Sequence, residues 1–345
     1  MKDKLERWLI ALFIVGSLAV FVWTIQMRPR ILVLHSYGAD YSWVRDVNIG
    51  LKRVLDQKRS YAVRWHYMDL KRFPWREAKE NAGIRSRRVI DEFSPDVIIA
   101  VDDDAQEYAA KYYVNHPKIK IVFAGINGDI EPYGYDKASN ATGILERKQL
   151  TATRDAIRDA GIVHWPEGGA ARLLLIGDTS ESVKSDMEHL RKFDWKPVTV
   201  AETRLAGTFD EWQEIIRSAP GRADVIITTN YRKLTRSAAS RELVSPEEVV
   251  KWTEGNSKLP VIGTNGFYVE DGGMLAIGTS GYEQGEVAAK LATQIIDKGT
   301  SPKLLPVVST SQFVVFMRPA LLKSHNVKLP PLYEAFARAN NNYIE

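Results

Sequence analysis

The stretch Ile31-Leu32-Val33-Leu34-His35-Ser36-Tyr37 joins four consecutive apolar residues to a polar exit, and this arrangement decides the fold class. It is the first of several short runs whose apolar residues are continuous rather than alternating: 31–34, 97–101, 119–123 (interrupted only by Lys120), 173–176, 225–227 and 261–262. Continuous runs are typical of strands that are buried on both faces, as in parallel sheets. The sequence therefore predicts parallel β-structure beginning near residue 31.

Between these runs, apolar residues recur at helical spacing over 44–55 and again over 287–296. Two helix starts are marked by capping residues, because Thr208 precedes Glu211 by three positions and Ser245 precedes Pro246 and Glu248. Alternating strands and helices predict an α/β fold, and 345 residues exceed the roughly 250 to 300 that one core organises. We expect two doubly wound parallel-sheet lobes.

Composition narrows the class of protein. With 45% hydrophobic and 26% charged residues, the chain has the balance of a folded globular protein. The absence of cysteine excludes disulfides, thiolate metal sites and a cysteine nucleophile. The net charge of +4 comes from 47 basic and 43 acidic residues mixed along the chain, which argues against nucleic acid as a partner.

The first residues predict export. Lys2, Lys4 and Arg7 precede residues 8–25, which carry no charge and are nearly long enough to span a bilayer. A signal-peptide cut after Ala19 would leave the bulky residues 20–23 at the new terminus. We therefore expect an uncleaved signal anchor in the cytoplasmic membrane, with the rest of the chain on the periplasmic or extracellular side. A soluble periplasmic protein, released by cleavage, is the alternative.

Ligands of open parallel sheets bind beyond the carboxyl ends of the strands, so the loops after the apolar runs are the candidate site. Polar and aromatic residues gather in those loops and in the loop before the last long helix. The candidate ligand-binding residues are His35, Ser36, Tyr37, Trp43, Asp102, Asp103, Asn127, Asp178, Asn230, Asn265 and Tyr282.

These residue types suggest roles. Tyr37 and Trp43 would enclose the apolar part of a small ligand, and Asp102 with Asp103 would receive a positive or hydroxyl group. The hydrogen-bonding residues would be Ser36, Asn127, Asn230 and Asn265. Each of these loops has a second interpretation, in which its polar residues only cap the following helix.

The sequence gives less support for a metal site or for enzymatic activity than for ligand binding. Three consecutive aspartates, residues 102–104, also suit a cation, although we expect neither a metal nor a cofactor. No G-x-S-x-G, H-E-x-x-H or phosphate-loop motif occurs, so we do not expect an enzyme.

Several segments together carry a resemblance to a known family. They are 31–37, the Asp-rich turn 101–105, 142–144, the stretch from 281–285 through 298–299 to 305–307, and the tail segments 313–317, 320–322 and 329–331. In these segments the chain resembles the ABC-transporter substrate-binding proteins, whose characterised members include tryptophan-type binders. The resemblance runs from about residue 30 to the end.

The resemblance implies a type I periplasmic-binding-protein fold, with two lobes joined by three chain crossings and a ligand cleft between them. Residues 1–29 would form the anchor and a short linker, 30–142 plus 272–305 lobe 1, and 143–271 plus 306–345 lobe 2. The implied function is capture of a small, amino-acid-like solute by lobe closure and its presentation to an ABC permease. Two alternatives stay open: a ligand-sensing subunit for a separate membrane sensor kinase, and an exported enzyme on the same fold.

Overall fold

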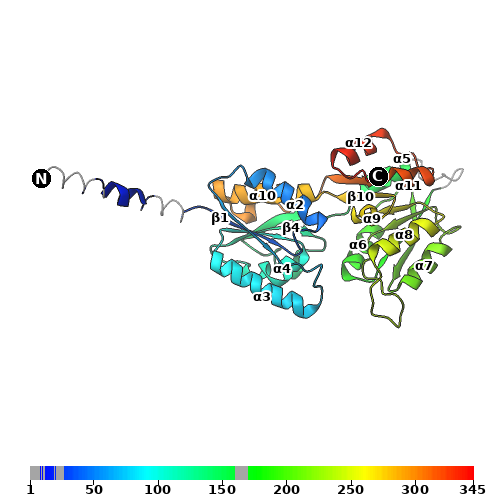
Figure 1. The fold of residues 1–345 in the computed structure, drawn as a ribbon, viewed down its shortest axis with the longest axis horizontal. Coiled ribbons are helices and arrows are strands. Elements are labelled where there is room, and N and C mark those ends of the chain that lie inside the picture. The colour runs from blue at the N-terminus through cyan, green and yellow to red at the C-terminus, as the bar shows by residue number, and fades with distance from the viewer. Residues whose placement is uncertain (1–7, 9, 11, 19, 21–26, 160–169) are drawn as a thin grey trace. The chain divides into compact units, whose positions relative to one another are not determined.

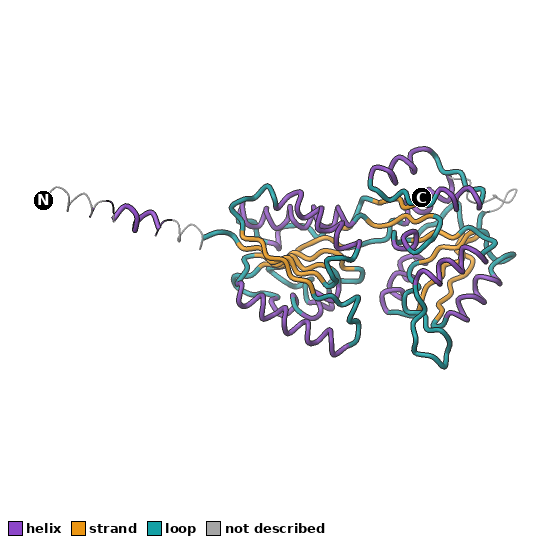
Figure 2. Tube along the Cα trace, in the orientation of Figure 1, coloured by secondary structure: helices purple, strands orange, loops and turns teal. Residues whose placement is uncertain are grey.

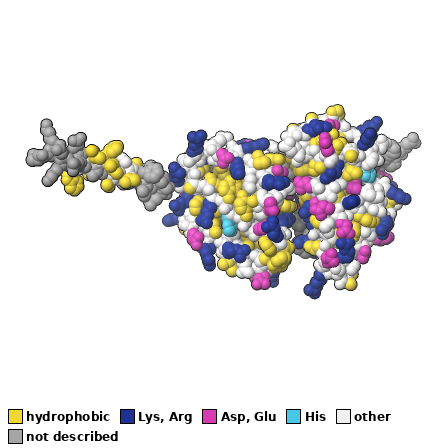
Figure 3. All heavy atoms as spheres, viewed as in Figure 1, with side chains coloured by type: hydrophobic (Ala, Val, Ile, Leu, Met, Phe, Trp, Pro, Cys, Tyr) yellow, Lys and Arg dark blue, Asp and Glu magenta, His cyan; other side chains and the backbone are white. Residues whose placement is uncertain are grey.

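The computed structural model describes residues 8, 10, 12–18, 20, 27–159 and 170–345. The chain divides into two compact units (Figures 1 and 2). The first unit comprises Met1–Ile126, Ile130–Ile144 and Gln284–Val308, and the second comprises Asn127–Asp129, Leu145–Glu283 and Ser309–Glu345. Basic and acidic side chains are spread over the drawn face of both units (Figure 3).

The first unit is built on a six-stranded sheet of order β11-β5-β4-β3-β1-β2. Its strands are β1 (Arg30–His35), β2 (Ala62–Tyr67), β3 (Val97–Val101), β4 (Lys120–Ile126), β5 (Ala141–Leu145) and β11 (Val308–Ser309). β1 pairs in parallel with β2 and β3, and β3 with β4. β3 is buried along its whole length, which explains its continuous apolar sequence.

Helices cover both faces of this sheet (Figure 1). α2 (Ser42–Leu55) and α10 (Gly281–Lys298) lie on one face, and α3 (Arg76–Phe93) and α4 (Asp103–Tyr108) lie on the other. Three short 3-10 turns complete the connections: η1 (Ala110–Tyr113), η2 (Glu131–Tyr133) and η3 (Pro302–Leu304). Val47 and Leu51 of α2 are fully buried in the same core cluster as Ile31 and Val33, as the helical spacing predicted.

The second unit has a six-stranded sheet of order β12-β10-β9-β8-β6-β7. Its strands are β6 (Arg172–Asp178), β7 (Thr199–Ala206), β8 (Val225–Thr228), β9 (Val261–Gly263), β10 (Leu275–Thr279) and β12 (Phe313–Met317), the last antiparallel to β10. Its helices are α5 (Leu150–Asp159), α6 (Glu181–Lys192), α7 (Phe209–Ser218), α8 (Pro246–Asn256), α9 (Phe267–Glu270), α11 (Pro319–Ser324) and α12 (Pro331–Ala339). One core cluster joins the sheet to α5, α6, α11 and α12, and another joins it to α7, α8 and α9.

Two parallel-sheet α/β units confirm the expected fold class. Both predicted helix starts are present, since Thr208 forms a complete capping box with Glu211. At α8, Ser245 accepts a hydrogen bond from the Glu248 N–H, while the Glu248 carboxylate pairs with Arg236 instead of reaching back to the cap.

The division of the chain differs from the expected one at several places: Asn127–Asp129, expected in the first lobe, belong to the second unit, residues 143–144 and 306–308, expected in the second lobe, belong to the first, and residues 272–283 differ as well. We expected residues 272–283 in the first lobe, but β10 pairs with β9 and β12 in the second sheet. The chain therefore re-enters the first unit at Gln284 and leaves it again after Val308.

Eight of the 18 residues of the predicted membrane anchor, 8–25, lie outside the described residues. Among those that are described, no helix is both long enough and apolar enough to cross a bilayer. The anchor stays a prediction.

Candidate functional site

Asp102 lies at the carboxyl end of β3 in the first unit, directly before α4. It is 3% exposed and has a backbone φ of +67°, a conformation that strains a residue other than glycine. Its N–H donates to the Ala124 carbonyl at 2.9 Å, and its carboxylate accepts a 2.9 Å hydrogen bond from the Trp43 indole. These contacts hold a carboxylate at the exit of the central strands.

The three consecutive aspartates do not form one cation site, because each has a different partner. Asp103 accepts a hydrogen bond from the Tyr133 hydroxyl at 2.9 Å, and Asp104 forms a 2.8 Å ion pair with Lys79. Within the described part of the chain, no group of three or more His, Cys, Asp or Glu side chains is arranged to hold a metal ion.

An aromatic pair lies next to these aspartates. Tyr37 and Tyr41 meet edge to face, with 5.5 Å between ring centroids. The Lys71 ammonium lies 4.3 Å from the Tyr37 centroid and 5.5 Å from the Tyr41 centroid. Burial and the nearby Asp102 hold the pKa of Tyr37 well above its usual value. The Lys71 ammonium therefore already covers the face of these rings in a cation–π contact.

His35 has a structural role in the core of the first unit. Its ring is fully buried, stacks against Tyr67 at 5.2 Å between centroids, and places Nε2 2.8 Å from the Asn48 side-chain oxygen. Burial lowers the pKa of His35 to about 4, so the ring is neutral at pH 7.

Ser36 has a similar structural role. Its hydroxyl donates to the Val101 carbonyl at 2.8 Å and accepts from the Ala105 N–H at 2.7 Å. These bonds tie β1 to β3 and to the start of α4.

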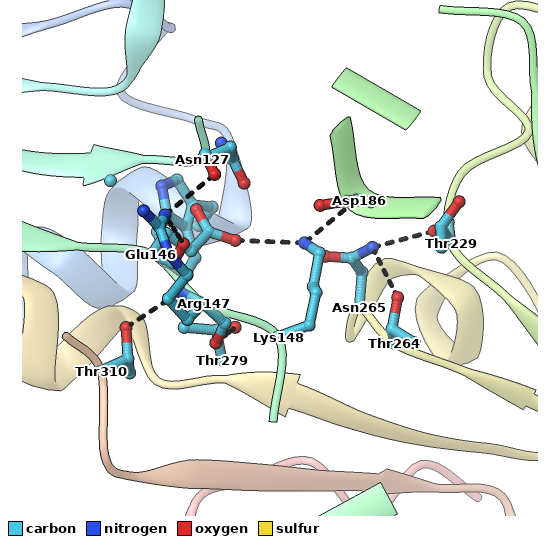
Figure 4. Close-up of polar contacts among 12 residues, drawn as sticks. Asn127, Glu146, Arg147, Lys148, Asp186, Thr229, Thr264, Asn265, Thr279 and Thr310 are labelled. Atoms are coloured by element: carbon cyan, nitrogen blue, oxygen red, sulfur yellow. Dashed lines mark hydrogen bonds and ion pairs between the residues drawn. The ribbon is translucent and has the colours of Figure 1, made fainter. Parts of the chain in front are cut away.

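In the second unit, Lys148 is the centre of a buried charged group (Figure 4). Its ammonium donates to the Asn265 side-chain oxygen at 2.8 Å and lies 3.3 Å from Glu146 and 3.8 Å from Asp186. The side chains of Lys148, Glu146 and Asp186 are only 7, 9 and 12% exposed. Asn265, which follows β9, also donates to the Thr229 carbonyl after β8 at 2.8 Å, so the group lies at the carboxyl edge of this sheet.

Arg147 ties the connecting segments of the same unit together. Its guanidinium donates to the backbone carbonyls of Asn127 at 2.9 Å and Gly128 at 3.0 Å. Its own carbonyl accepts a 3.3 Å hydrogen bond from the Thr279 hydroxyl, and its N–H lies 3.4 Å from the Thr310 hydroxyl (Figure 4). Asn127 therefore enters this network through its backbone.

Asp178 and Asn230 are occupied by neighbouring backbone. The Asp178 carboxylate accepts from the N–H groups of Ser180 at 2.9 Å and Lys233 at 3.1 Å, and the Asn230 side-chain oxygen accepts from the Arg232 N–H at 3.0 Å. These are the turn and cap contacts of the second interpretation. Tyr282 is half-buried in the first turn of α10.

The structure thus gathers some of the predicted residues and adds others. In the first unit it brings together Tyr37, Trp43, Asp102 and Asp103; in the second, Asn265 and the backbone of Asn127. The sequence reasoning missed the partners Tyr41, Lys71, Tyr133, Glu146, Arg147, Lys148 and Asp186. For residues 146–148, the charged triplet Glu-Arg-Lys directly after the apolar segment 144–145 was an available signal.

Comparisons with known proteins identify a family and a fold. The family model described as ABC transporter substrate binding protein matches residues 77–332. No curated protein matches the chain.

Three solved structures illustrate the likeness. An ABC domain from Streptococcus pneumonia in complex with L-Trp shares 15% identity over 90% of this chain and 98% of its own, with a TM-score of 0.63. The ligand-free, open form of a substrate-binding protein with adhesive properties from Clostridium difficile shares 17% identity over 91% of this chain and 98% of its own, with a TM-score of 0.64. A chain of the TorS sensor domain–TorT complex in the absence of ligand shares 10% identity over 88% of this chain and 97% of its own, with a TM-score of 0.50. At these identities the likeness shows the fold alone.

Proposed function

Because the chain belongs to the ABC transporter substrate-binding protein family, we propose that it captures a small solute outside the cytoplasm and delivers it to an ABC permease. The family match over residues 77–332 carries this proposal. Capture requires binding without chemical conversion, so the solute should return unchanged after incubation with the protein. The uncharged segment 8–25 supports tethering to the cytoplasmic membrane, which fractionation of cells tests.

For the solute we propose an aromatic molecule with a cationic group, such as an aromatic amino acid. The support is the acidic and aromatic group of the first unit, where the buried Asp102 carboxylate is held in a strained backbone beside Trp43 and close to Tyr37. Strain of this kind, about 1 to 3 kcal/mol, is commonly retained at functional sites. The solved relative with bound L-Trp has the same fold.

Calorimetry on the purified full chain in detergent tests the ligand class. L-Tryptophan and tryptamine, which carry an ammonium group, should bind, and indole-3-propionate, which lacks it, should not. Asp102→Asn keeps the size of the side chain but removes its charge, and should weaken binding by about ten- to a hundredfold, the range of a charge-assisted hydrogen bond. The control is Asp178→Ala, which should lower stability by about 1 kcal/mol and leave affinity unchanged. If both variants bind tryptophan normally, the Asp102 group is not the recognition site.

Sensing is the second candidate, favoured by the presence of a membrane-proximal binding domain after a predicted anchor. Deleting the gene separates the two roles. Loss of uptake of the radiolabelled solute supports transport, whereas intact uptake with a lost transcriptional response to the solute supports sensing.

A further inference from the structure

Two aromatic side chains are exposed next to each other on the first unit, in the loop between β2 and α3. Phe73 is 44% exposed and Trp75 is 59% exposed. Their rings meet edge to face with 5.9 Å between centroids. Paired large aromatics that remain in solvent are typical of interaction surfaces.

These rings border a groove of about 410 Å³. The loop contributes Met68, Leu70, Phe73 and Trp75, and α3 contributes Glu77, Ala78, Asn81 and Arg85. Met68 and Leu70 are only 5% and 2% exposed, so the inner wall of the groove is apolar and firmly packed. The α3 side of the groove is polar, since Glu77, Asn81 and Arg85 line it. A concave groove with one apolar and one polar wall suits a protruding side chain of another protein better than it suits the flat surface of a lipid bilayer.

The segment that forms the groove carries an excess of basic residues. Residues 68–88 contain seven basic and three acidic side chains, a net +4 that equals the formal charge of the whole chain. Arg72, Arg76 and Lys79 are paired, with Asp40, Glu80 and Asp104 respectively. Arg85 and Arg88 are exposed on α3 and have no ion-pair partner among the described residues, which leaves their charge available to a partner.

We propose that this groove docks an acidic polypeptide segment that inserts one aromatic or aliphatic side chain between Trp75 and α3. The inserted side chain would lie against Met68, Leu70 and the exposed rings, while carboxylates on either side of it pair with Arg85 and Arg88. Basic and apolar side chains lie side by side along the edge of the first unit where Figure 1 places α3 (Figure 3). No residue that lines the groove belongs to the candidate solute-binding group, so this surface serves a protein partner rather than the solute.

A defined peptide tests the proposal without knowledge of the natural partner. The probe is a fluorescein-labelled ten-residue peptide with one tryptophan flanked by Glu and Asp, and its matched control replaces every acidic residue by lysine. Fluorescence anisotropy with the full chain in detergent should show binding of the acidic peptide only, weakened by raising NaCl from 50 to 500 mM.

Two substitutions locate the site. Trp75→Ala and Arg85→Glu should each weaken peptide binding at least tenfold while leaving the melting temperature and solute binding unchanged. The controls Leu332→Ala and Lys192→Glu alter side chains that are equally exposed, at 62% and 77%, but belong to the second unit, and both should bind like the wild type.

Three results would overturn the proposal. They are equal binding of the two peptides, binding of neither, and binding of phosphatidylglycerol vesicles in place of the acidic peptide with the same dependence on Trp75. The last result would assign the surface to lipid.

Discussion

Replacing Lys148 by methionine is the most direct test of how the second unit is held together. Methionine keeps an unbranched stem of similar length but removes the ammonium. The substitution deletes the 2.8 Å hydrogen bond to Asn265 and the ion pairs with Glu146 and Asp186. Because those two carboxylates are 9% and 12% exposed, water replaces the lost cation poorly.

The distances set the expected size of the effect. At an effective dielectric constant of about 20, charges separated by 3.3 and 3.8 Å attract each other by about 5 and about 4 kcal/mol. Desolvation of the ammonium offsets part of this attraction, and breaking a buried pair from one side typically costs about 3 to 5 kcal/mol. For a unit of this size, such a loss lowers the melting temperature by roughly 6 to 20 °C.

Urea unfolding followed by circular dichroism measures the loss. Lys192→Met is the matched control, because Lys192 also pairs with a glutamate, at 3.6 Å, but is 77% exposed; its loss should stay below about 1 kcal/mol. Adding Glu146→Gln to Lys148→Met should restore part of the stability, since it removes one carboxylate that has lost its cation. If Lys148→Met costs no more than Lys192→Met, the buried ion pairs do not stabilise the unit and the reasoning fails.

Three further predictions concern stability. The lowered pKa of His35, about 4, means that the unfolded chain binds a proton more readily than the folded one below pH 6.5. The neutral His35 ring therefore stabilises the folded state fully above pH 6.5, and about 3 kcal/mol of this stability is lost as the pH falls towards 4. Chemical unfolding of His35→Phe should show a correspondingly smaller loss of stability on acidification than the wild type. The hydrogen bond from His325 to Glu254 raises the pKa of His325, so the stabilisation by this pair is complete below pH 6.5 and is lost as the pH rises through the raised pKa. His325→Gln should therefore destabilise the protein more at pH 5.5 than at pH 9. An equal loss of stability at both pH values would contradict the argument. Thr208→Ala, which breaks a complete capping box, should cost about 1 kcal/mol in thermal unfolding and more than Ser245→Ala, which breaks a single cap bond.

The inner strands of both sheets could be predicted because burial on two faces leaves a continuous apolar sequence. β3 and β8 are fully buried and were found from that signal alone. The edge strands β2 and β7 were missed, since one side of each lacks a neighbouring strand and polar residues such as Arg64 and Glu202 occur within them. β10 was missed for a different reason: it is fully buried, but its sequence Leu-Ala-Ile-Gly-Thr is short of large apolar residues.

The candidate site was predicted only where a strand exit provides it. Asp102 directly follows β3, and Trp43 lies in the first turn of α2, the helix that follows β1, so both lie at strand exits, where ligands of parallel sheets bind. Lys148 lies instead in the segment between β5 and α5, and its importance depends on Asp186 and Asn265, which are 38 and 117 positions away in sequence. Spacing along one chain carries no information about contacts of that range.

Asp102 and Asp178 show why residue type alone cannot separate a recognition residue from a cap. Both are aspartates at the end of a buried strand, and both are almost fully buried. Asp178 accepts hydrogen bonds from the N–H and the hydroxyl of Ser180 in its own turn and from the Lys233 N–H in the loop after β8, so its charge completes local structure. Asp102 is oriented by an indole 59 positions away and keeps a strained φ that capping does not require. The same residue type in the same sequence context therefore has two different environments. Asp178 is bound within its own turn and the neighbouring loop, whereas Asp102 is bound by the indole of a side chain distant in sequence. The Asp102→Asn and Asp178→Ala variants test whether only Asp102 takes part in recognition.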